Sequence, residues 1–201
     1  MMKHKVETLS KRHNAIIEAF LCVETNEILS TYNSKERRTI IRHSKEMDDF
    51  LKKEALVEQN KGLSTTHLLI DKDNNKLIGF ISLCNDCLSL DIDEKNKMNM
   101  PYLTIPAVKI ARLGIDNNYQ GQSLGKFLIG YSTILISHIK KYSGVTMVTL
   151  DCYKDKIAYY QKLGFKFNSL QPKQLEYDSL TSMRITVEEL ANIITKWSEL
   201  L

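Results

Sequence analysis

The sequence predicts a fold of the α/β class, a mixed (α+β) β-sheet with helices packed on it. The first observation is the order of patterns, because short strand-like segments recur among segments with apolar residues at steps of three and four. The second is size, since 201 residues, 43% of them hydrophobic and 26% charged, suffice for one well-filled core. The third is that no Pro/Gly/Ser-rich linker, repeat or composition break divides the sequence. We therefore expect a single domain over residues 1–201.

The first half of the sequence predicts helices followed by a pair of strands. Residues 31–60 show the spacing of one or two amphipathic helices. Residues 64–71 and 76–83 resemble strands, and the turn-rich triplet 73–75 joins them. Residues 85–104 are polar, and we expect a mobile excursion between strands near the mouth of any active site.

Strands and helices alternate in the second half. Strands are expected at 110–115, 145–151, 165–167 and 182–186. A long helix is expected from Leu124, with an apolar face made of Phe127, Leu128, Tyr131, Leu135, Ile139 and Tyr142. A short helix over 157–163 should end at Gly164. The last helix should begin at a capping box at Thr186 and carry an apolar stripe of Leu190, Ile194, Trp197 and Leu201.

Composition restricts the class of protein. No run of about 18 apolar residues is present, and the N-terminus lacks the apolar segment of a signal peptide, so we expect a cytoplasmic protein without a membrane span. Of the four cysteines, Cys84 and Cys87 form a CxxC pair, but no second pair or spaced histidine pair accompanies it. We therefore expect no metal site and reduced thiols.

The positive charge is concentrated in one segment. The net charge is +4, and residues 35–45 alone hold five Lys/Arg and one Glu. On a helix, Lys35, Arg38, Arg42 and Lys45 would form one side, here called the basic stripe. Two interpretations stay open, a solvated helix face and a contact with nucleic-acid phosphates.

The most informative stretch runs from Ile110 to Phe127 and predicts a strand, a glycine-bearing turn and the start of a helix. Such a turn presents backbone N–H groups at the positive end of a helix dipole, which suits a phosphate. An ordinary strand-to-helix turn is the alternative.

Two motifs in this region resemble the GNAT acetyltransferases. QGQSLG, residues 120–125, resembles their pyrophosphate loop, and RLGID, residues 112–116, resembles the strand that splays to take the pantetheine arm of acetyl-CoA. Ser123 stands where the family usually has glycine, so its side chain either serves a phosphate or crowds it. The resemblance implies an acetyl-CoA site made of Leu113, Gly114, Ile115, Gln120, Gly121, Gln122, Ser123, Leu124, Gly125 and Lys126.

A further GNAT-like motif, YYQKLGF, begins at Tyr159, about 40 residues after the loop. In the resemblance, Tyr160 faces the coenzyme sulfur and protonates the leaving thiolate, while Tyr159 packs inside. A phenol with a pKa of about 10 is protonated at neutral pH and can donate. The alternative for Tyr160 is a core tyrosine.

The general base is not evident from the sequence. The strand 108–115 offers Lys109 and Arg112 but no carboxylate. An α-amino group, with a pKa near 7.7–8.0, needs less help to lose its proton than a lysine side chain near 10.4. We therefore favour an α-amino acceptor, with water carrying the proton.

A narrower resemblance covers roughly residues 47–195, which are similar to the GNAT toxins that acetylate the amino group of aminoacyl-tRNA. Two departures are Thr65, where those proteins often have arginine, and the less typical N-terminal extension, residues 1–45. The resemblance implies an N-acetyltransferase that uses acetyl-CoA, with aminoacyl-tRNA as acceptor and an antitoxin and a homodimer as partners. Alternatives are a small-molecule, peptide or protein amine as acceptor, and a non-catalytic coenzyme-binding or partner-binding module.

Overall fold

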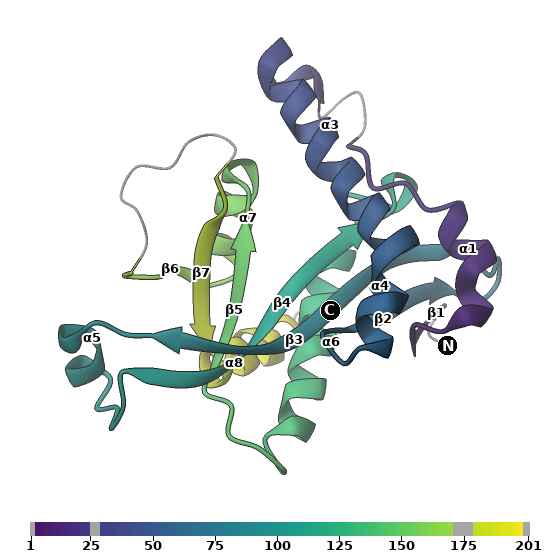
Figure 1. Cartoon of the computed structure of the whole chain (residues 1–201). Helices are drawn as coiled ribbons and strands as arrows, with labels where there is room; N and C mark the ends of the chain where they lie inside the picture. The colour runs from purple at the N-terminus through teal and green to yellow at the C-terminus, as the bar shows by residue number, and fades with distance from the viewer. Residues whose placement is uncertain (1–2, 25–28, 171–178, 199–201) are drawn as a thin grey trace. The chain divides into compact units, whose positions relative to one another are not determined.

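The structure is a computed structural model that describes residues 3–24, 29–170 and 179–198. Seven strands form one mixed sheet in the order β1-β2-β3-β4-β5-β7-β6 (Figure 1). The strands are β1 (His4–Thr8), β2 (Thr65–Asp71), β3 (Leu77–Ser89), β4 (Thr104–Ile115), β5 (Met147–Cys152), β6 (Lys166–Phe167) and β7 (Thr181–Thr186). Because β4 and β5 are parallel while β1–β2, β2–β3, β5–β7 and β6–β7 are antiparallel, the predicted mixed sheet is confirmed.

The chain forms two compact units. Unit 1 comprises residues 1–83 and 111–129, and unit 2 comprises residues 84–110 and 130–201. The expectation of a single domain stays a prediction. None of the helices in the described parts of the chain is both long and apolar enough to cross a membrane.

Unit 1 has its core between strands and N-terminal helices. It contains η1 (Lys11–His13), α1 (Asn14–Glu18), α3 (Ser34–Asp49), η2 (Phe50–Glu54) and α4 (Ala55–Asn60). Phe80 of β3 lies at the centre, with ring centroids 5.6 Å from Phe20 and 6.1 Å from Phe50. Gln59 attaches α4 to β2, because its side chain accepts from the Thr66 N–H while donating to the Leu9 carbonyl.

The predicted amphipathic helices over 31–60 are confirmed. Asn33 caps α3 by accepting from the N–H groups of Lys35 and Glu36, and the Glu36 carboxylate accepts from the Asn33 N–H in return. The helical stretch continues through a π-helical turn, η2, into α4. Ile40 and Leu51 are buried, so the side opposite the basic stripe faces the core.

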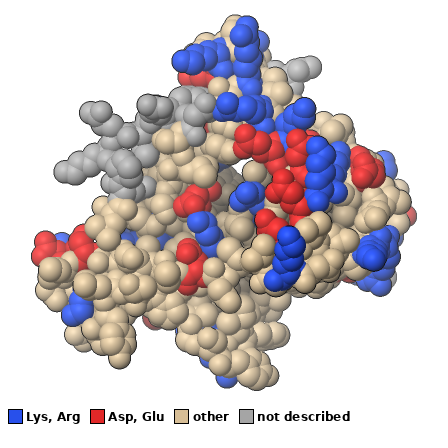
Figure 2. Space-filling view, in the orientation of Figure 1, with Lys and Arg blue, Asp and Glu red and all other residues tan. Residues whose placement is uncertain are grey.

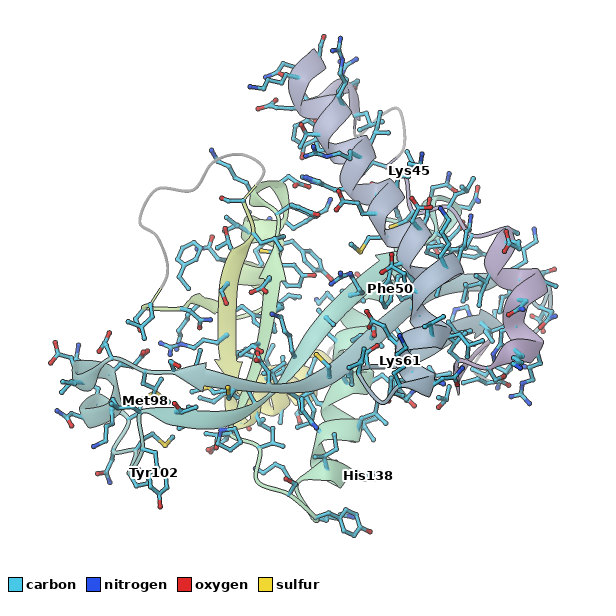
Figure 3. The ribbon with its side chains drawn as sticks, in the orientation of Figure 1. Lys45, Phe50, Lys61, Met98, Tyr102 and His138 are labelled. Carbon is cyan, nitrogen blue, oxygen red and sulfur yellow. The ribbon has the colours of Figure 1, made fainter. Side chains whose placement is uncertain are left out.

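Unit 2 contains the expected excursion in a different form. The prediction of a mobile polar segment over 85–104 is wrong in extent, because β3 continues to Ser89 and β4 begins at Thr104, with α5 (Ile92–Lys97) between them. Although most residues of this segment are polar, buried and exposed positions alternate along it. Leu88 and Leu90 are buried with Ile105, Ala107 and Met147. Tyr102 points away from the strands at the α5 end (Figure 3).

The long helix α6 (Leu124–Ile139) is confirmed, but its predicted face is partly wrong. Tyr142 lies beyond the end of the helix and is 90% exposed, and Phe127 is 43% exposed. The buried positions are Leu128, Ile129, Ser132 and Ile136. The stripe is therefore rotated relative to the one expected from apolar residues alone.

The C-terminal elements of unit 2 follow the sequence closely. They are η4 (Lys154–Lys156), α7 (Ile157–Lys162) and α8 (Val187–Ser198). The capping box at Thr186 is confirmed, because its hydroxyl accepts from the Glu189 N–H while Glu189 accepts from the Thr186 N–H. Leu190 is buried, whereas Leu201 and the side chain of Trp197 lie outside the described part of the chain.

Candidate active site

The strand-to-helix turn of unit 1 has the predicted shape. Beyond Ile115, residues 117–119 form a 3₁₀ turn (η3), Gly121 has φ +77°, and α6 begins at Leu124. The backbone N–H of Phe127 donates to the Ser123 carbonyl at 3.1 Å. Because this is the first turn of the helix, the N–H groups of residues 124–126 point ahead of it, toward the loop.

The turn suits an anionic group. Gly121, Gln122 and Ser123 are exposed, and a Cβ built on Gly121 would meet no atom within 4 Å. The first turn of α6 contains no acidic residue that would offset the positive end of the helix dipole. The residues present therefore fit the diphosphate of acetyl-CoA on backbone N–H groups, with Lys126 on the same turn.

Ser123 has a backbone conformation that favours glycine. Its φ is +59°, in the left-handed region that glycine adopts freely and other residues adopt at a cost of about 1–2 kcal/mol. The serine that stands where the family usually has glycine thus lies at a position whose backbone favours glycine.

The strand residues Leu113, Gly114 and Ile115 form the end of β4 in unit 1. A Cβ on Gly114 would lie 2.7 Å from Cε1 of Phe80, so this position accepts only glycine against the ring. The aromatic core at Phe80 therefore fixes the strand end that leads into the loop.

Gln120 has a task that sequence reasoning missed. Its side-chain Nε2 donates to the carbonyls of Cys22 at 3.2 Å and Ile115 at 3.1 Å. Asp116 is buried, and its carboxylate accepts from the N–H groups of Leu21 and Asn118. No local sequence pattern indicates these contacts, because Leu21 and Cys22 are about 95 residues away along the chain.

Tyr160 belongs to unit 2, on α7. Its ring contacts Tyr159 at 5.1 Å and Phe165 at 5.8 Å, both edge-on, and the residue is half-buried. Burial raises the pKa of Tyr159 to about 12, as expected for the inward-facing member of the pair. Gly164 ends this helical segment with φ +90°, and a Cβ there would lie 2.6 Å from Cδ1 of Ile193.

Unit 2 also holds a carboxylate that was missed because it lies on the neighbouring strand. The parallel register places Lys109 of β4 beside Thr149 of β5, and the Lys109 Nζ contacts the Asp151 Oδ2 at 2.5 Å. The two side chains are 29% and 28% exposed. The pairing of β4 with β5 ends at Ile110 and Leu150, so Asp151 follows the last residue of β5 that pairs with β4.

The basic stripe is exposed on α3 of unit 1. Lys35, Arg38, Arg42 and Lys45 are all exposed, and Figure 3 labels Lys45 on the half of α3 that continues into η2. Figure 2 shows Lys and Arg atoms gathered at the top of the view, over α3. Arg37 differs from the stripe because its guanidinium donates to the carbonyls of Tyr32 and Ser30.

The predicted residues thus fall into two groups. The loop, the strand end and the basic stripe lie in unit 1, and Tyr160 lies in unit 2. Their roles in binding and catalysis stay predictions.

Comparison with known proteins identifies the fold and the family pattern. The family described as "Acetyltransferase (GNAT) domain" matches residues 64–167, a range that includes the strand end, the loop and Tyr160. The tRNA-acetylating toxin of Mycobacterium tuberculosis (strain ATCC 25618 / H37Rv) is 24% identical over 131 residues, which cover 64% of this chain and 77% of that protein.

Solved structures of the toxin AtaT have the same fold. AtaT complexed with acetyl-methionyl-tRNAfMet has a TM-score of 0.66 at 18% identity and covers 98% of each chain. A mutant AtaT toxin bound to acetyl-CoA and the C-terminus of the antitoxin AtaR has a TM-score of 0.65 at 16% identity, covering 96% of this chain and 99% of that one.

Proposed function

The chain belongs to the GNAT acetyltransferase family, and we propose that it transfers the acetyl group of acetyl-CoA to the α-amino group of an aminoacyl-tRNA. The observation that carries the proposal is the loop at the start of α6, where Gly121 and Ser123 hold positive φ angles before a helix with no acid in its first turn. The name of the mycobacterial relative and the acetyl-methionyl-tRNA in the AtaT complex support the acceptor.

In the proposed site the backbone N–H groups from Gln122 to Lys126 bind the diphosphate, with Gly121 giving the close approach. Acetyl-CoA supplies an activated thioester. The backbone N–H near Leu113, on the strand end, stabilises the oxyanion that forms when the amine attacks.

Two groups of unit 2 handle protons in this proposal. Tyr160 gives its phenolic proton to the leaving thiolate. Asp151 takes the proton that the attacking nitrogen loses, directly or through one water, while Lys109 fixes its carboxylate. The N–C bond forms, the C–S bond breaks, and one proton moves from nitrogen to sulfur overall.

The basic stripe on α3 is proposed to contact the phosphates of the tRNA acceptor. Its four cations are exposed on one continuous helix. An aminoacyl-tRNA acceptor also implies a cytoplasmic protein, and the AtaT–AtaR complex supports an antitoxin as protein partner.

The test uses acetyl-CoA labelled on the acetyl group, a set of aminoacyl-tRNAs, deacylated tRNA and free amino acids. We expect label on the aminoacyl group of one or more tRNAs, found by mass spectrometry after nuclease digestion. Label on free amino acids and on no aminoacyl-tRNA would contradict aminoacyl-tRNA as the acceptor. Coenzyme binding without transfer to any amine would contradict the enzymatic proposal.

A further inference from the structure

A two-residue segment of unit 1, Leu21–Cys22, has all four backbone groups engaged; we call it the strap. The Leu21 N–H donates to the Asp116 Oδ2 at 3.1 Å, and the Leu21 carbonyl accepts from the Asn117 N–H at 2.8 Å. The Cys22 N–H donates to the Asp48 Oδ1 at 2.8 Å, and its carbonyl accepts from Gln120. One end of the strap is therefore bound to α3, and the rest to the loop before α6.

The two carboxylates that accept hydrogen bonds from the strap are buried, and burying a carboxylate costs free energy. Asp116 is 5% exposed and Asp48 is 7% exposed. Burial raises the pKa of Asp48, the hydrogen bond from Cys22 opposes that rise, and the nearby charge of Asp116 adds to it. Apolar residues at these positions would remove the acceptors of the Leu21 and Cys22 N–H groups, so the carboxylates hold the strap in place.

Asp116 uses both of its oxygens. Oδ2 binds the strap, and Oδ1 accepts from the backbone N–H of Asn118 at 3.0 Å and from its side chain at 2.9 Å. The same carboxylate thus fixes the strap and the first turn of the loop 117–123, here called the coenzyme loop. Gln120 closes the loop two residues later, by donating to the Ile115 carbonyl as well as to Cys22.

Residues 121–123, which follow Gln120, include backbone conformations that cost free energy. Gly121 and Ser123 both have positive φ, and residues 121–123 are exposed. A loop that is fixed before it meets its ligand binds more tightly, because less conformational freedom is lost on binding. The contacts of Asp116 and Gln120 lie directly before this strained stretch.

We propose that Asp116 and Asp48 are positioning residues of the coenzyme site: through the strap they fix the loop 117–123 in the shape that binds a diphosphate, and they attach that loop to α3. The inference rests on the proposed function only in requiring that the loop binds coenzyme A. The acceptor does not enter it.

We expect an Asp→Asn substitution to have different effects at Asp116 and at Asp48. In Asp116→Asn one oxygen is replaced by an NH₂ group, which must face the N–H of either Leu21 or Asn118, so one contact is lost. In Asp48→Asn the amide oxygen can still accept from Cys22, whereas Asp48→Ala removes the acceptor. The charge is therefore dispensable at Asp48, and the acceptor is not.

The experiment is calorimetric titration of the full-length protein with coenzyme A, together with the KM for acetyl-CoA and kcat wherever an acceptor is turned over. We expect Asp116→Asn and Asp48→Ala to weaken coenzyme A binding about tenfold, by the loss of one hydrogen bond to a charged group, and to raise KM while leaving kcat near the wild-type value. Asp48→Asn, which keeps an acceptor oxygen, should weaken coenzyme A binding less than Asp48→Ala does.

The matched control is Asp71→Asn. Asp71 also accepts from two backbone N–H groups of unit 1, those of Asp73 and Asn74, but in the exposed turn between β2 and β3. It should not change coenzyme affinity. Wild-type affinity in Asp116→Asn and Asp48→Ala, with native circular dichroism, would overturn the inference, as would equal weakening in Asp71→Asn. A wild-type protein that does not bind coenzyme A would contradict the proposed function itself, which separates the two failures.

Discussion

Replacing Tyr160 by phenylalanine separates its chemical role from its packing role. The ring keeps its edge-on contacts with Tyr159 at 5.1 Å and Phe165 at 5.8 Å, so the free energy of unfolding should change little. The change removes the phenolic hydroxyl and with it the proton that it can donate. Because general acid catalysis contributes roughly 10²–10⁴-fold, we expect kcat to fall by at least about 10², which corresponds to about 2.7 kcal/mol of activation free energy.

The assay follows thiol release at saturating acetyl-CoA and acceptor, with coenzyme affinity measured separately by calorimetry. Tyr159→Phe is the matched control, since it removes the neighbouring hydroxyl, whose pKa of about 12 indicates a buried and protonated group. Its kcat should stay within a few-fold of the wild type. An unchanged kcat in Tyr160→Phe would remove this residue from the mechanism, and an equal fall in Tyr159→Phe would indicate damage to α7 instead of lost proton transfer.

Four further changes test other parts of the structure. Ser123→Gly should stabilise the protein by about 1 kcal/mol and so raise its thermal midpoint, since glycine adopts the left-handed φ of +59° without cost. A lower thermal midpoint would contradict this prediction. Reversing the charges of Arg38 and Arg42 should weaken tRNA binding and reduce its dependence on salt concentration, whereas the same change at two exposed lysines at 140–141 should do neither. If both pairs of substitutions weaken tRNA binding equally, the basic stripe is only a solvated helix face. Asp48→Asn should be more stable than the wild type at pH 7, because burial raises the folded-state pKa of Asp48 and the wild type loses stability as this carboxyl ionises. In chemical unfolding, the difference in unfolding free energy between variant and wild type should shrink as the pH falls to 3.8. A difference that does not depend on pH would refute this prediction. Glu7→Gln should be less stable than the wild type above pH 4.5, since hydrogen bonds from His13 and Lys5 lower the pKa of Glu7 to about 2, and this difference should vanish as the pH falls to about 2.

The sequence predicted those features that depend on neighbours along the chain. The glycine-bearing loop, the cap at Thr186 and the helix end at Gly164 are each specified within a few residues. The excursion over 85–104 was misjudged because its few apolar residues pair with distant strands, so that burial was invisible in the local composition. The face of α6 was misjudged because Tyr142 looked apolar and Ser132 polar, yet Ser132 is buried and Tyr142 is not.

The missed parts of the candidate site share one cause. Asp151 lies next to Lys109 only through the parallel register of β4 and β5, across 42 positions of sequence. Asp116 and Asp48 meet the strap across 95 and 26 positions. A carboxylate on a strand or helix gives no sign, from its own neighbours, of which distant N–H group or ammonium will contact it.

The groups that are proposed to move protons lie in a different unit from the coenzyme loop and α3. Unit 1 contains the coenzyme loop with the strap that supports it, and also α3, whereas unit 2 contains Tyr160 and the Lys109–Asp151 pair. Groups that only bind contribute equally to the ground state and the transition state, so their loss raises KM, whereas groups that move protons act in the transition state, so their loss lowers kcat. Variants of the loop, the strap and α3 should therefore act on KM for acetyl-CoA or on tRNA affinity, and variants at Tyr160 and Asp151 on kcat. An Asp151→Asn variant with a raised KM and an unchanged kcat would assign this carboxylate to binding and leave the proton on the attacking nitrogen to water.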